Sequence, residues 1–205
     1  SLPVRILVIA ITLAMLLGAY VQQRSASFMT VAAKNFIDAL EPWQVKEVMF
    51  KFDDQERSNW FYTPVPRKGL SLHDMKPYQR QLAMAMIAAG VSQRGFIKIV
   101  TIMSLDEILL RIENVVRRDP DNYNITIFGE PSETGVWGYR VEGHHVSQNI
   151  TLVNGKIQDA PSFFGSNPAE AKVGPRKGSR VLAAEEDLAL DLVNSLTPEE
   201  RKVSI

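Results

Sequence analysis

Three segments between Tyr123 and Val153 alternate apolar and polar residues with a period of two. Such alternation is typical of antiparallel strands, because successive side chains of a strand point to opposite faces of the sheet. The segments are 123–128, 136–141 and 145–153. Asn154-Gly155 follows the third segment, and this dipeptide favours a two-residue hairpin turn. The sequence therefore predicts an antiparallel sheet in the second half of the chain.

The remainder of the chain has the spacing and the capping residues of helices. Helical patterns cover residues 28–57, with a break at Pro42, and residues 71–90. A further helix carries an apolar stripe from Leu105 to Val116, and a last helix spans residues 183–196. Most helices precede the strands instead of alternating with them. We therefore expect a single α+β domain over residues 28–205, with a helical N-terminal half packed on a small antiparallel sheet and a closing C-terminal helix.

The last residues predict one more helix start. Thr197 and Glu200 have the spacing of a capping box, in which each side chain satisfies a backbone amide of the first turn. The sequence ends at Ile205, before this helix has completed two turns. We expect the chain to be the N-terminal part of a longer protein.

The first 27 residues resemble a secretory signal peptide. Arg5 precedes an apolar run over residues 6–21, and small and polar residues follow. The run is shorter than the roughly 20 apolar residues that a membrane-spanning helix usually needs. We therefore expect an exported protein, periplasmic or extracellular, that loses residues 1–27. The second interpretation is an uncleaved membrane anchor, with these residues as the only membrane contact.

Composition excludes several classes of function. The 205 residues include 23 basic and 23 acidic side chains, so the chain lacks the positive field that nucleic-acid-binding proteins use. It contains no cysteine, which excludes disulfides, zinc–thiolate sites and thiol catalysis. We expect a small molecule or a metal ion as the partner, and no nucleic acid.

Side chains capable of chemistry are concentrated in residues 137–149, which contain two of the three histidines, His144 and His145. On a regular strand these two rings would point to opposite faces, whereas a bulge or tight turn at Gly143 would bring them together. Glu142 shares a face with His144 on a regular strand and could orient its imidazole. Arg140 lies on the same face, where it could pair with Glu142.

Three interpretations of this segment stay open: a structural cluster, a divalent metal site, and acid–base catalysis without a metal. The candidate catalytic residues are Glu142, His144 and His145, of which the two histidines are also the candidate metal ligands. We favour His145, because polar side chains follow it on its own face of the strand. The candidate ligand-binding residues are Trp60, Trp137, Arg140, Ser147 and Asn149.

Several separate motifs occur in a characteristic order after residue 27. They are Trp60–Pro64, Arg67–Leu70, Gln79-Arg80, Phe128–Pro131, Trp137–His145 with Ser147 and Asn149, and Phe163–Pro168. Together they resemble the domain-of-unknown-function family 3500. The resemblance implies export and a longer natural protein with further histidine-containing motifs downstream, and it implies no particular activity.

Two functions from different classes follow from these observations. The first is a metal-dependent hydrolase or oxidase, in which the histidine segment supplies ligands or acid–base groups. The second is a non-enzymatic extracytoplasmic protein that binds a ligand along the same segment. Whether the chain is an enzyme stays open at the level of sequence, because both functions require the same polar strand.

Overall fold

The fold was analysed in a computed structural model, which describes residues 2–115 and 118–205. This part of the chain contains six α-helices, two short 3-10 helices and seven strands. The helices are α1 (Leu2–Asp38), α2 (Pro42–Val48), η1 (Gln55–Ser58), η2 (Leu72–Asp74), α3 (Pro77–Gly90), α4 (Gln93–Glu113), α5 (Ala183–Ser195) and α6 (Pro198–Ser204). The strands are β1 (Met49–Phe50), β2 (Leu70–Ser71), β3 (Asn124–Phe128), β4 (Val136–Gly143), β5 (Val146–Val153), β6 (Lys156–Gln158) and β7 (Ser162–Phe164).

The strands form one sheet with the order β1-β3-β4-β5-β6, to which β2 adds against β3 and β7 against β5. The α+β class is confirmed, and the three long strands β3, β4 and β5 lie in the predicted segments. The sheet is mixed, because β1 pairs with β3 in parallel, with Met49 opposite Ile127. This two-residue strand is too short to produce an alternating pattern, so the sequence predicted only antiparallel pairs.

The predicted turn at Asn154-Gly155 is confirmed. It joins β5 to β6, and both residues have the positive φ angles, 50° and 74°, that Asn and Gly adopt most readily. The hairpin between β4 and β5 extends further than the sequence indicated. Here Gly143 pairs with Val146, so that His144 and His145 form the turn itself.

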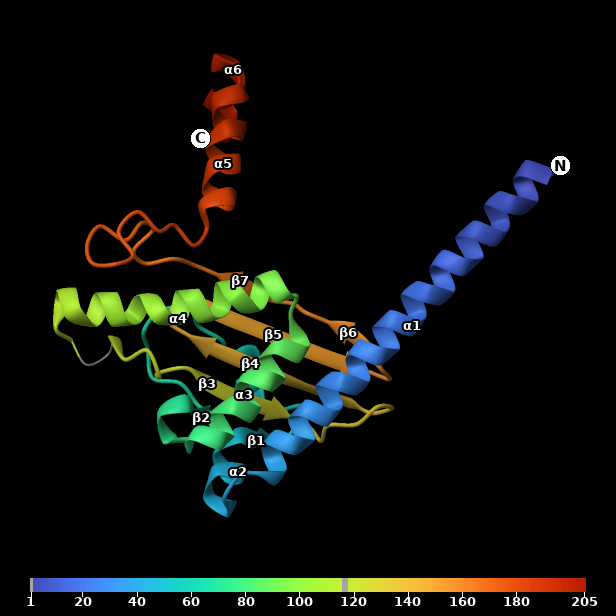
Figure 1. The fold of residues 1–205 in the computed structure, drawn as a ribbon, viewed down its shortest axis with the longest axis horizontal. Coiled ribbons are helices and arrows are strands. Elements are labelled where there is room, and N and C mark those ends of the chain that lie inside the picture. The colour runs from blue at the N-terminus through green and yellow to red at the C-terminus, as the bar shows by residue number, and fades with distance from the viewer. Residues whose placement is uncertain (1, 116–117) are drawn as a thin grey trace.

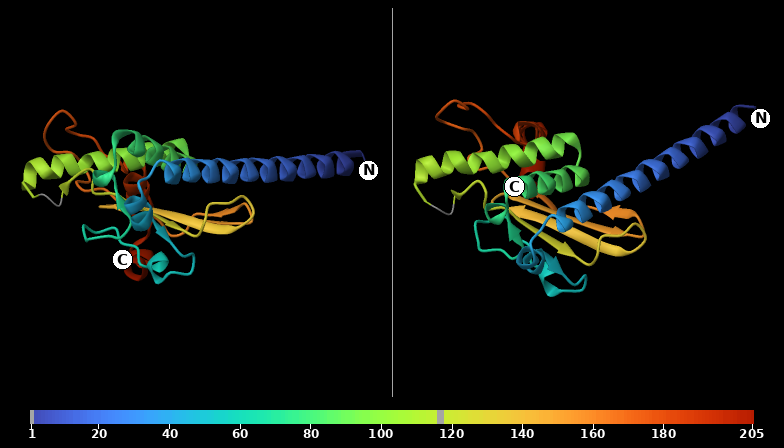
Figure 2. Two further views of the ribbon diagram at one scale, coloured as in Figure 1. Left: turned by 90° about the horizontal axis from the view of Figure 1, so that it is seen from below. Right: turned by 60° about the horizontal axis from the view of Figure 1, so that its bottom comes forward.

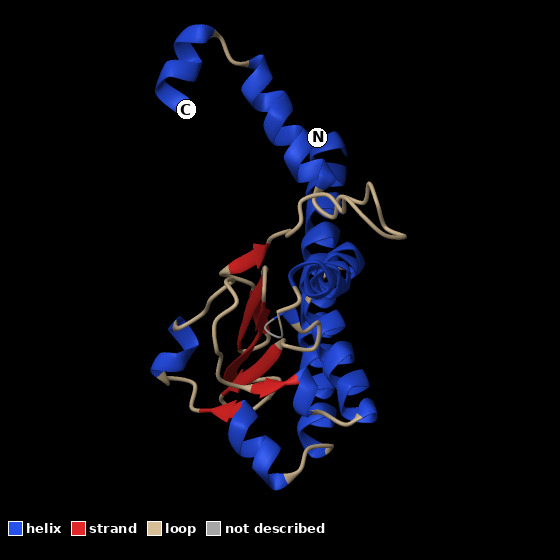
Figure 3. Cartoon of the chain, turned by 90° about the vertical axis from the view of Figure 1, so that its left-hand side faces the viewer, coloured by secondary structure: helices blue, strands red, loops and turns tan. Residues whose placement is uncertain are grey.

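Helices α1, α3 and α4 cover one face of the sheet (Figures 1 and 2). The core between the layers is apolar and continuous. It includes Phe36 of α1, Met86 of α3, Ile102 of α4, and Trp137 and Leu152 of the sheet. The opposite face of the sheet carries no long helix and is covered by the loop that contains η1 and by the segment leading to β7 (Figure 3).

The region predicted as one helix over residues 71–90 is divided in two. Ser71 caps η2 by accepting a hydrogen bond from the His73 amide, and α3 begins separately at Pro77. The break has a local cause, because the residue before a proline is driven out of the helical region, and Lys76 is extended at ψ 156°. Helix α4 begins at Gln93, well before the predicted stripe, and Val116 of that stripe lies outside the described residues.

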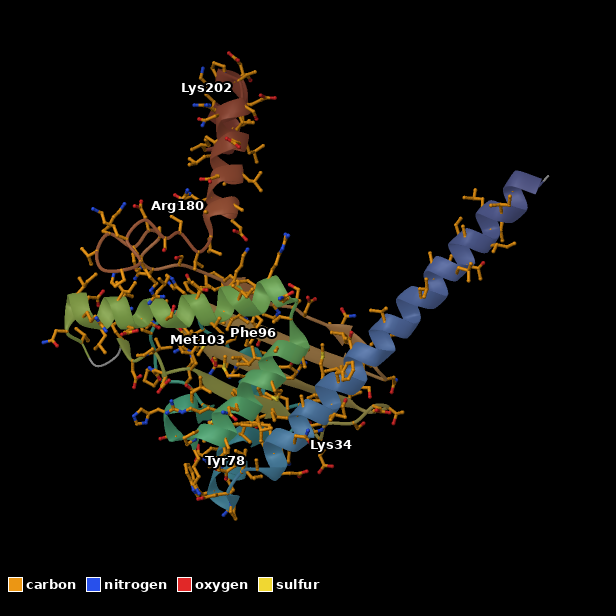
Figure 4. The ribbon with its side chains drawn as sticks, viewed as in Figure 1. Lys34, Tyr78, Phe96, Met103, Arg180 and Lys202 are labelled. Carbon is orange, nitrogen blue, oxygen red and sulfur yellow. The ribbon has the colours of Figure 1, made fainter. Side chains whose placement is uncertain are left out.

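The predicted C-terminal helix is present as α5, and the capping box at Thr197 and Glu200 starts α6 as expected. Both helices extend away from the helix–sheet core (Figure 1; Arg180 and Lys202 mark this region in Figure 4). Neither contains a buried residue. The core between the sheet and helices α1, α3 and α4 is therefore formed without them.

Helix α1 runs without interruption through residue 27. Its C-terminal part packs in the core through Ala33 and Phe36, whereas the N-terminal apolar side chains Leu7, Ile9 and Met15 are exposed. Within the described ranges, none of the helices has both the length and the apolar character needed to traverse a membrane.

Candidate functional site

The central feature of the site is the tight turn that connects β4 to β5, which we call the histidine hairpin (Gly143–Val146). His145 occupies its second turn position with a left-handed φ of 61°. Because the chain reverses here, the two imidazoles do not point to opposite faces. Their ring centroids lie 4.2 Å apart. The convergence that the sequence allowed as one alternative at Gly143 is the arrangement found.

His144 is held by a carboxylate from helix α4. Nδ1 of His144 lies 2.7 Å from Oδ1 of Asp106, and both side chains are nearly buried. The hydroxyl of Tyr123 lies 2.9 Å from Oδ2 of Asp106 and 2.8 Å from the carbonyl oxygen of His144. Burial, reinforced by Asp106, raises the pKa of Tyr123 well above its usual value, so this phenol remains a proton donor.

A cation lies against the ring of His144. Nη1 of Arg118 lies 3.1 Å from Nε2 and 3.4 Å from Nδ1 of His144, so it sits over the ring and not in line with either nitrogen. Nε and Nη2 of Arg118 pair with the carboxylate of Glu113 at 2.8 and 3.1 Å. Because Asp106 lies 2.7 Å from Nδ1, that nitrogen donates to the carboxylate, which leaves Nε2 as the nitrogen that can exchange a proton.

His145 lies beside the aromatic rings of Tyr62 and Phe163. Its amide donates to the carbonyl of Tyr62, and its carbonyl accepts from the amide of Gly165, each at 2.7 Å. Burial lowers the pKa of the His145 imidazole, and the neighbouring His144 lowers it further. Nδ1 of this ring is buried and makes no hydrogen bond within the described residues. His145 is therefore a neutral, half-buried imidazole beside the oriented one.

Glu142 belongs to a separate ionic cluster on the opposite face of the sheet. Its Oε1 lies 2.9 Å from Nε of Arg140, as the shared-face argument predicted, and Oε2 accepts from the Phe61 amide. Nη2 of Arg140 donates to Glu56 at 2.6 Å. Burial raises the pKa of Glu142 despite the opposing effect of Arg140. The carboxylate that orients His144 is therefore Asp106 and not Glu142.

Arg67 ties the covering loop to the histidine hairpin. Its guanidinium donates to the carbonyls of Thr63, of Val65 at 2.9 Å and of Gly143 at 2.9 Å. Its Nε lies 3.9 Å from Oε2 of Glu142. Burial lowers the pKa of Arg67, and Glu142 offsets part of that effect. One side chain thereby links the loop, the turn and the ionic cluster.

The five predicted ligand-binding residues do not form one group. Trp60 and Asn149 line the same cavity of about 220 Å³ on the face without long helices, with Gly138 at its floor. Trp137 lies in the core and donates from Nε1 to the carbonyl of Ser132. Arg140 is fully buried in the ionic cluster, and Ser147 is buried and accepts a hydrogen bond from Asn149.

The described residues contain no group of three or more His, Cys, Asp or Glu side chains placed to hold a metal ion. The rings of the predicted ligand pair His144 and His145 lie 4.2 Å apart, measured between their centroids. However, the guanidinium of Arg118 lies against the His144 ring, and a positive group there opposes the binding of a cation.

Sequence reasoning missed three contributors to this site, namely Asp106, Arg118 and Tyr123. For one of them, Asp106, the sequence does contain a signal. Asp106 lies four residues after Ile102 and three before Leu109, on the buried stripe of α4. A carboxylate within an apolar stripe indicates a buried partner, although the sequence does not say which one.

The comparisons with known proteins agree with the motif order. Residues 22–205 match the family described as "Protein of unknown function (DUF3500)". No curated protein and no solved structure matches the chain. Since the family match covers nearly the whole chain, this protein belongs to the DUF3500 family.

Proposed function

We propose that the chain provides the acid–base centre of a hydrolase that acts on an anionic substrate. The observation that carries the proposal is the cluster of Asp106, His144 and Arg118. A carboxylate oxygen lies 2.7 Å from Nδ1 of the imidazole, and a guanidinium nitrogen lies over the ring, 3.1 Å from Nε2 and 3.4 Å from Nδ1. A carboxylate that holds the Nδ1 proton fixes the tautomer and stabilises the imidazolium that forms when Nε2 accepts a proton.

The proposed sequence of events begins with binding. A carboxylate or phosphate of the substrate accepts hydrogen bonds from Arg118. Nε2 of His144 removes a proton from a water molecule, whose oxygen attacks the carbonyl carbon or the phosphorus of the ester. The bond from that atom to the leaving-group oxygen breaks, and the proton on Nε2 passes to this oxygen, which restores the imidazole. Asp106 stabilises the resulting positive charge on the ring, and Tyr123 keeps Asp106 in position.

The neighbouring histidine supports this assignment. His145 stays neutral because its pKa is lowered, so it adds no second positive charge beside the His144 ring. Because the positive charge of Arg118 lies against the His144 ring, we infer that an anion rather than a divalent metal ion is the natural ligand beside this ring. Hydrolysis through a metal-bound water therefore has less support than direct acid–base catalysis.

A second candidate function is binding of a small molecule on the opposite face of the sheet. It is favoured by the cavity that Trp60 and Asn149 share, because an indole beside an amide offers both a stacking surface and hydrogen bonds. We also propose export of the protein, on the basic–apolar–small order of residues 1–27. Mass spectrometry of the protein from fractionated cells tests export, and an intact N-terminus in the cytosol would contradict it.

The acid–base proposal is tested first by nuclear magnetic resonance of ¹⁵N-histidine-labelled protein. We expect His144 as the Nδ1-protonated tautomer at neutral pH, and a change at its Nε2 when inorganic phosphate or acetate is added. Arg118→Met should remove the response to anions, whereas Arg111→Met on the exposed side of α4 should retain it. The opposite tautomer, or the same response in both variants, would contradict the proposal.

Hydrolysis is tested with p-nitrophenyl phosphate and with p-nitrophenyl esters of dicarboxylic acids. We expect turnover in the wild-type chain, with a loss of about 100-fold or more in His144→Gln and Asp106→Asn. Glu107→Gln, the next position on α4, serves as the control and should retain activity. Turnover that is unchanged in His144→Gln, or absent throughout a broad panel of anionic esters, would contradict the hydrolase assignment.

A further inference from the structure

A further cavity in the described part of the chain is separate from the histidine hairpin. It has a volume of about 520 Å³ and lies on the helix-covered face of the sheet, near the edge formed by β5, β6 and β7. The C-terminus of α3 and the first turn of α4 form its upper wall, where Phe96 is labelled in Figure 4. Its volume is within the range of about 300–1,000 Å³ that is usual for small-molecule sites.

The lining of this cavity is mixed, with apolar and polar surface in nearly equal parts. The apolar side chains come from α1, from the α3–α4 corner and from the sheet, and they are Met29, Ala89, Val91, Ile150, Ile157 and Phe164. At the corner, Gly90 has no room for a side chain, because an added Cβ would lie 2.4 Å from Cδ1 of Ile150. The helix corner thus packs directly on the cavity floor, which gives the wall a fixed position.

The polar groups of the lining already have defined partners. Ser162 donates to Oε1 of Gln148 at 2.6 Å, and the Gln148 amide donates to the carbonyl of Phe163. Ser92 accepts from the Gly95 amide at the start of α4. The hydroxyl oxygen of Ser162 can accept a further hydrogen bond, since it already donates its own proton.

The charge of the cavity lining indicates the chemistry of its ligand. Among the described residues that line the cavity, Asp159 is the one charged side chain, and it lies at the exposed rim. A carboxylate at the mouth and a hydroxyl acceptor on the wall complement a group that is both positive and rich in donors. An ammonium group on an apolar body satisfies both conditions.

We infer that this cavity binds a small amphipathic amine, with its apolar body against the sheet and its ammonium group at Asp159. The inference concerns a site distinct from the histidine hairpin and does not depend on the function proposed there. Three probes with one skeleton separate apolar burial from charge: 4-phenylbutylamine, 4-phenylbutan-1-ol and 4-phenylbutanoate.

Binding is measured by calorimetry on the wild-type chain and four variants. Ala89→Phe places an aromatic ring in the cavity, and Ala88→Phe places the same ring on the exposed side of the same turn. Ile157→Trp fills the cavity from the opposite wall and replaces Ala89→Phe if that variant does not fold. Asp159→Asn removes the charge and keeps the size of the side chain.

We expect the amine to bind about threefold more tightly than the alcohol and about tenfold more tightly than the carboxylate, as an exposed charge allows. Asp159→Asn should abolish the difference between amine and alcohol, and either cavity-filling variant should weaken all three probes at least tenfold. Ala88→Phe should match the wild type. Equal affinity in Ala89→Phe or Ile157→Trp, no binding of any probe, a preference for the carboxylate, or an amine preference retained by Asp159→Asn would overturn the inference.

Discussion

Oδ1 of Asp106 lies 2.7 Å from Nδ1 of His144 across a sequence separation of 38 residues. The contact joins the middle of helix α4 to the turn between β4 and β5, so it connects the helical layer to one end of the sheet. It exists because α4 carries a carboxylate on its buried stripe and because the hairpin turns His144 toward that helix.

Replacement of Asp106 by Asn should destabilise the chain by about 1.5–3 kcal/mol, the usual contribution of a hydrogen bond to a charged group. The substitution keeps the shape of the side chain but removes the charge that faces the His144 ring. Urea denaturation measures the loss. Glu107→Gln is the matched control, because Glu107 is half exposed and pairs only at the surface with Arg111; its change should stay within about 0.5 kcal/mol. Equal losses of unfolding free energy in both variants would contradict a specific role of Asp106.

Gly143→Ala should disturb the site through sterics alone. A Cβ at this position would lie 2.2 Å from Cδ1 of Tyr123, too close for any side-chain carbon. The Tyr123 ring must move, which breaks its contacts with Asp106, and we expect a loss of about 1–3 kcal/mol. Denaturation and the fluorescence of the tyrosine environment report the change. Gly18→Ala, where an added Cβ meets nothing within 4 Å, should be tolerated, and full stability of Gly143→Ala would disprove the packing argument.

Arg67→Lys should loosen the covering loop although it conserves the charge. A single ammonium group cannot reach the carbonyls of Val65 and Gly143 together, as the planar guanidinium does. We expect a loss of about 1–3 kcal/mol and faster hydrogen exchange of the His145 amide, which donates to Tyr62 of that loop. In the control variant Lys68→Arg, at the neighbouring exposed position, the His145 amide should exchange at the wild-type rate. Unchanged exchange in Arg67→Lys would show that the loop is held by other contacts.

The stability of the folded chain should fall at acidic pH because His145 becomes protonated. Its pKa in the folded chain lies below the ordinary value of 6.5, so the folded state favours the neutral ring. Because the folded-state pKa is lowered, the contribution of the neutral His145 ring to the free energy of unfolding is fully present above pH 6.5. This contribution is lost as the pH falls toward the folded-state pKa. We expect the melting temperature of the wild type to decrease more steeply between pH 7.5 and 5 than that of His145→Asn. Parallel curves for the two proteins would contradict the expected burial effect.

The parts of this structure that could be predicted from sequence are those set by near neighbours. The period-two alternation located β3, β4 and β5, because each strand is long enough for one face to be buried. The pairing of Arg140 with Glu142 followed from their positions two residues apart on one strand. The turn at Asn154 followed from the ease with which Asn and Gly adopt positive φ angles.

The histidine hairpin could not be predicted in the same way, because its turn lacks the usual residues. His145 adopts a positive φ without being Gly, Asn or Asp, so nothing local marks position 145 as a turn. Its contacts with Tyr62 and Gly165 hold the backbone there. The partners Asp106 and Tyr123 depend on how α4 crosses the end of the sheet, which is a tertiary property that a single sequence does not contain.

The left-handed backbone of His145 also determines which substitutions can isolate the role of its ring. A left-handed conformation costs most L-residues roughly 1–2 kcal/mol, whereas Asn tolerates it. The wild-type histidine already bears this cost, so His145→Ala removes the imidazole and leaves the backbone strain in place. His145→Gly and His145→Asn remove the ring and relieve the strain at the same time, and the relief offsets part of the stability that the ring contributes. A glycine or asparagine substitution would therefore understate the importance of the second histidine, and the alanine variant is the one that isolates its ring.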